Sequence, residues 1–297
     1  MHLIKSNFDK ILCVLKEILG EESAILKKQV KPGPKTKFSD VEVIALSCTA
    51  EYMGYDSENY FFSQLNKSVF PDLLSRRQYN DRRKKLLIKY EEVRKSIISQ
   101  IKTEQKVYII DSMPLKLCRY ARRGRNKIGQ QENDIKPNVG YCAAQEERYF
   151  GYKLHAVCSA EGAIEFFDIT PASFSDVNYL STVAQKLKNC HLIGDKGYIS
   201  QSYKEILREK AKVHIFTDSR KNAKKLQMIP VKYKGKRKKI ETIFSQLTDQ
   251  FNIQKNYSKN GSAYFTRIWS KVLSMTIINY IQQINNKPLS QIKYALA

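Results

Sequence analysis

Apolar residues in the first hundred positions recur at the spacing of a helix. Ile11, Leu15 and Leu19 are each four residues apart, so one side of a helix would carry all three. Ser39 precedes a similar stretch and stands three residues before Glu42, which is the spacing of a capping box. We predict four helices in this part of the chain, over residues 7–19, 39–54, 56–66 and 75–101.

After about residue 105 the pattern changes to short apolar runs that alternate with helical stretches. Strands are predicted over residues 106–111, 149–159, 163–170, 190–195 and 213–217, and helices over residues 175–187, 200–211, 237–247 and 262–284. This order implies an α/β fold, with a mixed five-stranded sheet flanked by helices, and it is also the element order of the RNase H-like fold. We therefore predict an all-helical domain over residues 1–104 and an RNase H-like catalytic domain over residues 105–297.

The charge balance points to a polyanionic partner. The chain has 52 Lys and Arg against 29 Asp and Glu, a formal net charge of +23, and nucleic acid is the commonest partner of so basic a protein. Anionic membrane or a ribosome would also attract this charge. Helix 75–101 begins with several arginines after a shorter helix and a turn, which is compatible with a helix-turn-helix unit and equally with a solvated charged face. We interpret residues 1–104 as a DNA-binding domain.

The cysteines and the N-terminus indicate the compartment. No two of the six cysteines have the spacing of metal ligands, so we expect reduced thiols and no zinc site. Charged residues interrupt the first twenty residues, which fit neither a signal peptide nor a membrane span. We expect a cytoplasmic protein.

Two acids follow predicted strands that could be neighbours. Asp111 ends the first strand and Asp195 the fourth, and α/β sheets bind ligands at the carboxyl ends of their strands. Two carboxylates at close range repel each other, so such a pair normally implies a bound divalent cation. Glu241, on helix 237–247, would complete the set. Each acid alone could instead cap a turn or a helix, and a helix cap is the preferred interpretation of Asp176.

Four segments in order carry a resemblance to a known family. They are "DSMPLKLC" around Asp111, "RYFGYKLHAVCS", "GDKGY" around Asp195 and "RKKIETIFSQL" around Glu241. Together they resemble the DDE transposases of bacterial insertion sequences, most closely the insertion sequence nine-eight-two family. The leading segments "SDVEVIALSCTAEYMGYDSENYFFSQL" and "FPDLLSRRQYNDRRKKL" are also similar to that family, so the resemblance covers nearly the whole chain.

The resemblance implies cleavage and strand transfer at the ends of an insertion sequence. Two Mg²⁺ ions, for which Mn²⁺ would substitute, would be held by Asp111, Asp195 and Glu241. The partners would be the double-stranded DNA of the element ends and of the target, bound by a homodimer in the bacterial cytoplasm, at the nucleoid. Arg237, four residues before Glu241, matches the arginine of the family's Tyr, Arg, Glu, Lys signature. Tyr233 lies one residue too far upstream for that signature, and Thr248 replaces its lysine.

Basic residues flank the predicted site. Lys153 and His155 are two apart in one strand and share a face. The resemblance places them beside the site, although a strand histidine is more often structural. Basic runs over residues 119–127 and 220–239 lie next to the predicted acids in sequence. The residues predicted to bind DNA or its phosphates are Arg237, Lys153, His155, Arg122, Arg123, Arg125, Lys236, Lys238, Arg76, Arg77, Arg82 and Arg83.

Two other functions fit the same acids. One is an RNase H-like nuclease or junction resolvase that cuts DNA without strand transfer. The other is a transposase-derived DNA-binding protein that has lost its chemistry. Only the first of these requires an intact acid triad.

Overall fold

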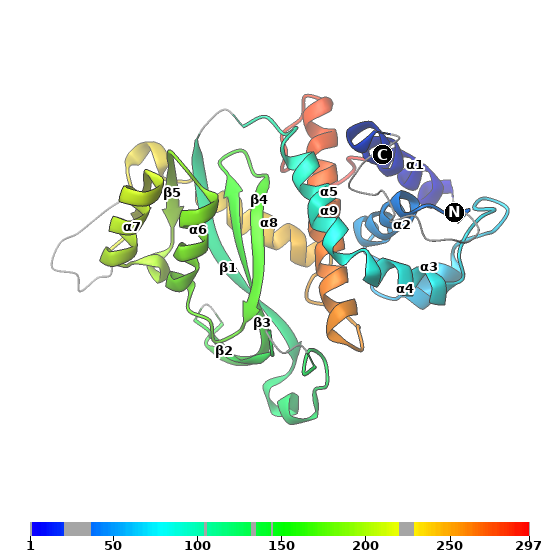
Figure 1. The fold of residues 1–297 in the computed structure, drawn as a ribbon, viewed down its shortest axis with the longest axis horizontal. Helices are drawn as coiled ribbons and strands as arrows, with labels where there is room; N and C mark the ends of the chain where they lie inside the picture. Colours follow the sequence, from blue (N-terminus) through cyan, green and yellow to red (C-terminus); the bar gives the residue numbers. More distant parts are fainter. Residues whose placement is uncertain are drawn as a thin grey trace. The chain divides into compact units, whose positions relative to one another are not determined.

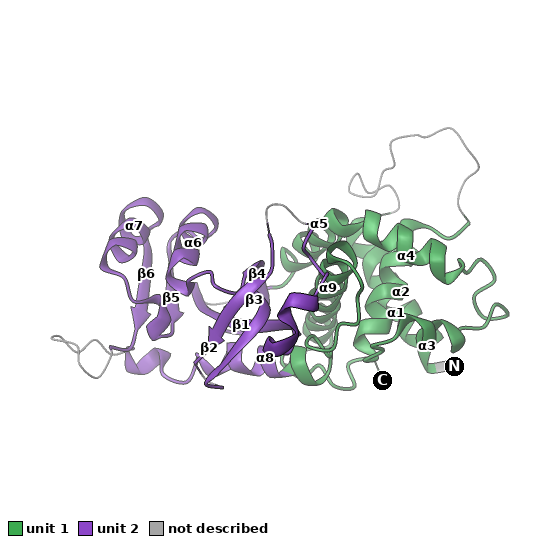
Figure 2. Ribbon diagram, turned by 90° about the horizontal axis from the view of Figure 1, so that it is seen from below, with its two compact units in different colours: residues 1–101, 246–297 green, residues 102–245 purple. Residues whose placement is uncertain are grey.

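A computed structural model describes residues 2–20, 37–103, 106–131, 135–143, 145–219 and 229–296 (Figure 1). It divides into two compact units, residues 1–101 with 246–297 and residues 102–245 (Figure 2). The predicted domain boundary, at residues 104 and 105, lies outside the described residues, as does the 220–228 part of the second basic run.

The first unit is helical. Its helices are α1 (His2–Leu19), α2 (Asp40–Tyr52), α3 (Glu58–Ser63), α4 (Arg76–Lys85), α5 (Leu87–Ile98) and α9 (Gly261–Ile284). The predicted capping box starts α2, with the Ser39 hydroxyl oxygen accepting from the Glu42 N–H. Helix α9 is buried on nearly every side and packs against α2 and α5. The sequence assigned this last helix to the catalytic domain, whereas the structure groups it with the N-terminal helices.

The single helix predicted over residues 75–101 is two helices. A capping box of Ser75 and Gln78 starts α4. At Leu86 the backbone leaves the helical region, and its N–H is shared by the carbonyls of Arg82 and Arg83, which tightens the last turn of α4. No proline or glycine marks this break, so the sequence pattern gave no sign of it.

A buried ion cluster holds α2, α4 and α9 together. Glu51 of α2 accepts hydrogen bonds from Arg267 Nε and Nη2 at 3.0 and 3.1 Å and from Lys271 Nζ, and Arg83 lies 3.9 Å away. All four side chains are almost fully buried. Burial alone would raise the pKa of Glu51, but Arg267 and Lys271 lower it to about 2. The carboxylate is therefore the anion around which three buried cations are arranged.

The second unit is a mixed sheet with helices. Its strands are β1 (Val107–Cys118), β2 (Asn138–Cys142), β3 (Glu147–Ser159), β4 (Ile164–Pro171), β5 (Cys190–Gly194) and β6 (Val213–Thr217), and its α-helices include α6 (Leu180–Lys186), α7 (Gln201–Ala211) and the start of α8 (Lys238–Asp249). Apolar residues of α6 and α7 pack on one face of β1, β5 and β6 (Figure 1). No helix in the described ranges is long and apolar enough to cross a membrane.

The sheet has six strands in the described residues, not the five predicted. The short β2 was missed; it pairs with the first part of β3, and β4 pairs with the rest of β3. Without β2 the order is β4-β3-β1-β5-β6, with β1, β5 and β6 parallel and β3 antiparallel to both β1 and β4. This mixed sheet is compatible with an RNase H-like domain.

Strand β1 is longer than predicted. The sequence ended it at Asp111, but it continues along β3 to Cys118. Its pairing with β5 stops at Ile110 and Gly194. Beyond that point one edge of β1 has no partner strand among the described residues, and an edge of this kind tolerates Pro114, which has no N–H to donate.

Candidate active site

Strands β1 and β5 bring two of the predicted acids to the same edge of the sheet. Ile110 and Gly194 form the last register pair of their parallel ladder, so the next residues, Asp111 and Asp195, leave the ladder side by side. Burial raises the pKa of Asp111 to about 6, and the nearby charge of Asp195 adds to the rise. The Ser112 N–H, 2.8 Å from Asp111 Oδ1, opposes it.

Arg237 connects the third acid to this pair. It lies one residue before α8, and its guanidinium donates to Asp195 Oδ1 and Glu241 Oε1, at 3.0 Å each. The pKa of Arg237 is raised, because the charges of Asp195, Glu241 and Asp111 together outweigh the effect of burial. The guanidinium therefore joins Asp195 to Glu241, and the charge of Asp111 acts on it without a direct hydrogen bond in the described contacts. The side chains of Asp195 and Glu241 are 49% and 51% exposed, so a ligand can reach them from solvent.

The three predicted acids have the ligand chemistry of a divalent-cation site, but their side chains are not positioned together to bind one in this structure. Carboxylate oxygens are the ligands that Mg²⁺ and Mn²⁺ prefer. In the described part of the chain, however, no three His, Cys, Asp or Glu side chains are arranged to hold a metal ion. Arg237 engages two of the three acids, so a cation that binds them must displace part of this contact.

Asp176 does not act as the helix cap that the sequence favoured. It begins the 3₁₀ helix η2 (Asp176–Tyr179), which has no side-chain cap hydrogen bond. Its Oδ1 instead accepts from Ser112 Oγ at 2.8 Å and from Lys153 Nζ at 3.1 Å. Its charge also raises the pKa of Asp111. Sequence reasoning missed this fourth acid beside the site, because its partners come from β1 and β3 and only the sheet register brings them together.

The predicted phosphate contacts in β3 have partners within the protein. Lys153 donates to Asp176 and to the carbonyl of Phe174 at 2.9 Å. His155 is fully buried, hydrogen-bonds Thr170 at 3.0 Å and stacks on Tyr179. A ring without exposed surface cannot touch a phosphate in this conformation, so the structural interpretation of His155 is favoured.

Tyr233, four residues before Arg237, is buried and contacts two strands of the sheet. Its hydroxyl is 2.6 Å from His191 Nδ1, and its ring packs beside Phe216. The ring is buried. These contacts anchor the residues that precede Arg237 to strands β5 and β6, which holds the start of α8 near Asp195.

The other predicted DNA-binding residues differ in exposure. Arg122, Arg123 and Arg125 are exposed on the 3₁₀ helix η1 (Tyr120–Arg125), as are Arg76, Arg77 and Lys238, while Lys236 is half-buried. The prediction that Arg83 binds DNA is wrong for this conformation, because the side chain is buried and paired with Glu58. Arg82 is paired with Asp40 and is largely covered. Neither arginine is free to contact a phosphate.

A cavity of about 560 Å³ lies next to the acids in the sheet unit. Arg148, Lys153 and Asp176 line it, and it extends to Gly197, two residues after Asp195. It offers room for a polar ligand beside the carboxyl edge of the sheet.

Comparison with known protein families identifies the class of this protein. The chain matches the transposase DDE domain family over residues 101–260, more than half of its length, and belongs to that family. It is a DDE-type transposase, a metal-dependent polynucleotidyl transferase of DNA recombination. The family generally uses divalent metal ions. No curated protein and no solved structure gives a significant match.

Proposed function

We propose that this transposase cleaves DNA at the ends of an insertion sequence and joins the freed ends to target DNA, as its resemblance to the insertion sequence nine-eight-two family implies. The observation that supports this most directly is that Asp111 and Asp195 directly follow the last register pair of two neighbouring parallel strands, and that Arg237 joins Asp195 to Glu241. The proposed catalytic domain is the RNase H-like part that begins near residue 105. The preceding helices form the DNA-binding domain.

The three acids would hold two Mg²⁺ or Mn²⁺ ions. When bound, such ions supply an activated nucleophile and stabilise the leaving oxygen of an in-line phosphoryl transfer. Asp111 is the most buried of the three and is fixed by the Ser112 N–H, so it defines the floor of the site. Arg237 keeps Asp195 and Glu241 together until a cation competes for them.

DNA would be held by two basic segments of the sheet unit. Arg122, Arg123 and Arg125 on η1, with Lys236 just before α8 and Lys238 at its first position, supply cations for the phosphate backbone. Two ends of one element must be brought together, so we infer that the protein acts as a homodimer on DNA.

A pre-cut end distinguishes strand transfer from simple cleavage. Purified protein is incubated with Mg²⁺, a duplex of the DNA that flanks the coding sequence, cut to leave a free 3′-hydroxyl, and a supercoiled target plasmid. A transposase joins the labelled end to the plasmid, and the joined product is resolved on a denaturing gel. A nuclease or resolvase would nick the plasmid without attaching the label, which would overturn the proposal.

Replacing Arg237 by Met is expected to strengthen Mn²⁺ binding by roughly three- to tenfold. The change removes a cation that competes for Asp195 and Glu241, and the gain stays modest because these carboxylates are half exposed. Calorimetric titration of the DNA-free protein with Mn²⁺ measures it. Lys210→Met, on α7, is the matched control and should bind Mn²⁺ as the unmodified protein does. Weaker binding in Arg237→Met would mean that Arg237 organises the acids for the metal instead of competing with it.

A further inference from the structure

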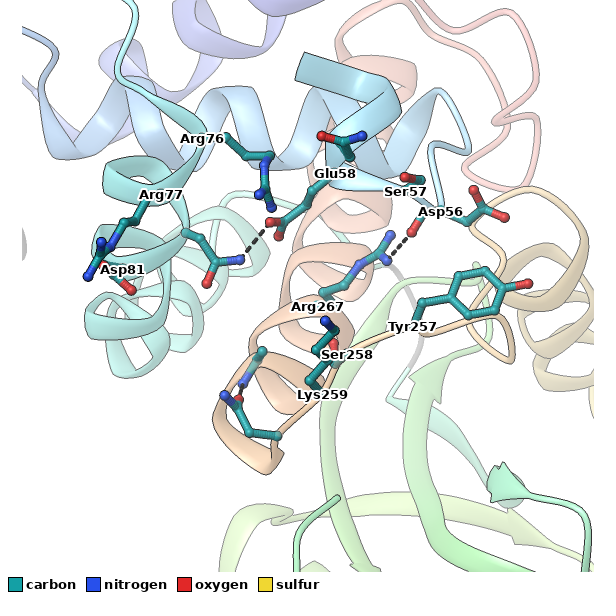
Figure 3. Close-up of a pocket in the computed structure, with 14 residues that line it drawn as sticks. Asp56, Ser57, Glu58, Arg76, Arg77, Asp81, Tyr257, Ser258, Lys259 and Arg267 are labelled. Atoms are coloured by element: carbon teal, nitrogen blue, oxygen red, sulfur yellow. Dashed lines mark hydrogen bonds between the residues drawn. The ribbon is translucent and has the colours of Figure 1, made fainter. Parts of the chain in front are cut away.

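The helical unit contains a polar cavity of about 590 Å³ (Figure 3), which lies in the range of ligand sites, roughly 300–1,000 Å³. Three segments that are far apart in sequence form its walls: the residues just before and at the start of α3, the first turns of α4, and the chain that leads into α9. Figure 3 shows Arg76 and Arg77 on one side of this space and Tyr257 and Lys259 on another.

The cations of this cavity are less well paired than its acids. Three of the charged lining residues have ion partners: Arg267 with Glu51, Glu58 with Arg83, and Asp81 with Lys84. Within the described ranges Arg76, Arg77 and Lys259 make no ion pair, and Asp56 is the lining acid left to balance them. The cavity therefore presents an excess of positive charge to an incoming ligand.

The two arginines do not stabilise the helix that carries them. Arg76 and Arg77 are the first two residues of α4, where the helix dipole disfavours cations. The Ser75–Gln78 capping box already satisfies this helix end. Arg77 interacts electrostatically with Asp81, one turn later, but neither arginine makes an ion pair in the described ranges. Two cations at this position cost helix stability, and an anionic ligand would reduce that cost.

We propose that this cavity binds the phosphodiester backbone of DNA through Arg76, Arg77 and Lys259, with the Tyr257 ring packed against the sugar or base. Tyr257 is 70% exposed, so its ring is available for such a contact. The assignment rests on the proposed function in that DNA is the ligand. Compared with the sequence prediction, this site leaves out the paired Arg82 and Arg83 and adds Tyr257 and Lys259, from the segment before α9.

Salt-dependent binding tests the site. The probe is a fluorescein-labelled duplex of mixed sequence and about 40 base pairs, and anisotropy gives Kd between about 50 and 200 mM salt. Each lost phosphate contact lowers the slope of log K against log salt by about 0.9. We expect a loss of about 2 for the Arg76→Gln/Arg77→Gln double variant and about 1 for Lys259→Gln. Kd should rise roughly tenfold for the double variant at the middle of this range.

Two matched variants separate this result from a loss of folding. Lys95→Gln, at an exposed lysine of α5 outside the cavity, should keep the unmodified slope. Asp81→Asn removes an acid from the cavity wall and should tighten binding severalfold, which a misfolded protein cannot do. Unmodified slopes in both the double variant and Lys259→Gln would overturn the site.

The two proposals fail in different ways. If the unmodified protein binds the duplex and joins pre-cut ends while the cavity variants bind equally well, the cavity assignment is wrong and the transposase function stands. If the unmodified protein binds no DNA at all, both proposals are overturned.

Discussion

Replacing Asp111 by Asn is expected to lower the joining of pre-cut ends by about 10³-fold or more. The substitution keeps the shape of the side chain but removes the most buried of the three carboxylates proposed to bind the metal ions. A bound metal ion contributes several kcal/mol of charge stabilisation to the transition state, and each 1.36 kcal/mol corresponds to a factor of ten in rate. The joined product, measured over time at saturating Mg²⁺, gives the rate.

Asp168 provides the control for this change. It lies in the same sheet, in register with His155, and is bound by Tyr179 and Lys186 instead of by Arg237. Asp168→Asn should join ends within a few-fold of the unmodified rate. Joining by Asp111→Asn at a comparable rate would show that the chemistry is located elsewhere.

Replacing Glu51 by Gln should lower the free energy of unfolding of the helical unit by about 3–5 kcal/mol. The new side chain has the same size, so no cavity forms, but Arg267, Lys271 and Arg83 are left buried without their common anion. Hydrogen exchange of the amides of α2 and α9 measures the opening free energy of this unit directly. Asp9→Asn, which breaks an exposed pair with Lys5 one helical turn away, should change it by less than about 0.5 kcal/mol.

The pH dependence provides a second check on Glu51. Its pKa is lowered from 4.5 to about 2 in the folded protein, so between these values the unfolded chain binds more protons than the folded one. The contribution of Glu51 to the free energy of unfolding is therefore fully present above about pH 4.5 and is lost as the pH falls toward 2. The Gln variant should lose less stability over this interval than the unmodified protein does. Equal losses would mean that Glu51 does not carry the charge in this cluster.

Local patterns predicted the elements well where hydrophobic period and end signals agreed. Helix α2 begins at the predicted capping box, and β1 and β5 are neighbours, as the element order required. Because the carboxyl ends of adjacent parallel strands meet at one edge of a sheet, the juxtaposition of Asp111 and Asp195 could be inferred from sequence. Strand β2 was missed because a five-residue run with a central glycine has too little alternation to be recognised.

Features that depend on tertiary pairing could not be read from the sequence. The role of Asp176 depends on Ser112 and Lys153 meeting it across two strands. The burial of Arg83 depends on Glu58, which lies twenty-five positions earlier. In sequence Arg83 looks like Arg76 and Arg77, since all three lie in one basic run; only packing separates an arginine that holds the core from one that faces a ligand.

Because the helical unit combines the two ends of the chain, the two units cannot finish folding in their order along the sequence. Helix α9 is the buried centre of the helical unit and supplies Arg267 and Lys271 to Glu51, yet it is synthesised after the whole sheet unit. Domains usually fold as they emerge, from the N-terminal end. Here the first hundred residues leave the ribosome with Glu51 lacking two of its cations, so the sheet unit is complete in sequence before the helical unit can close. The helical unit is therefore the last part of the nascent chain that can complete its fold.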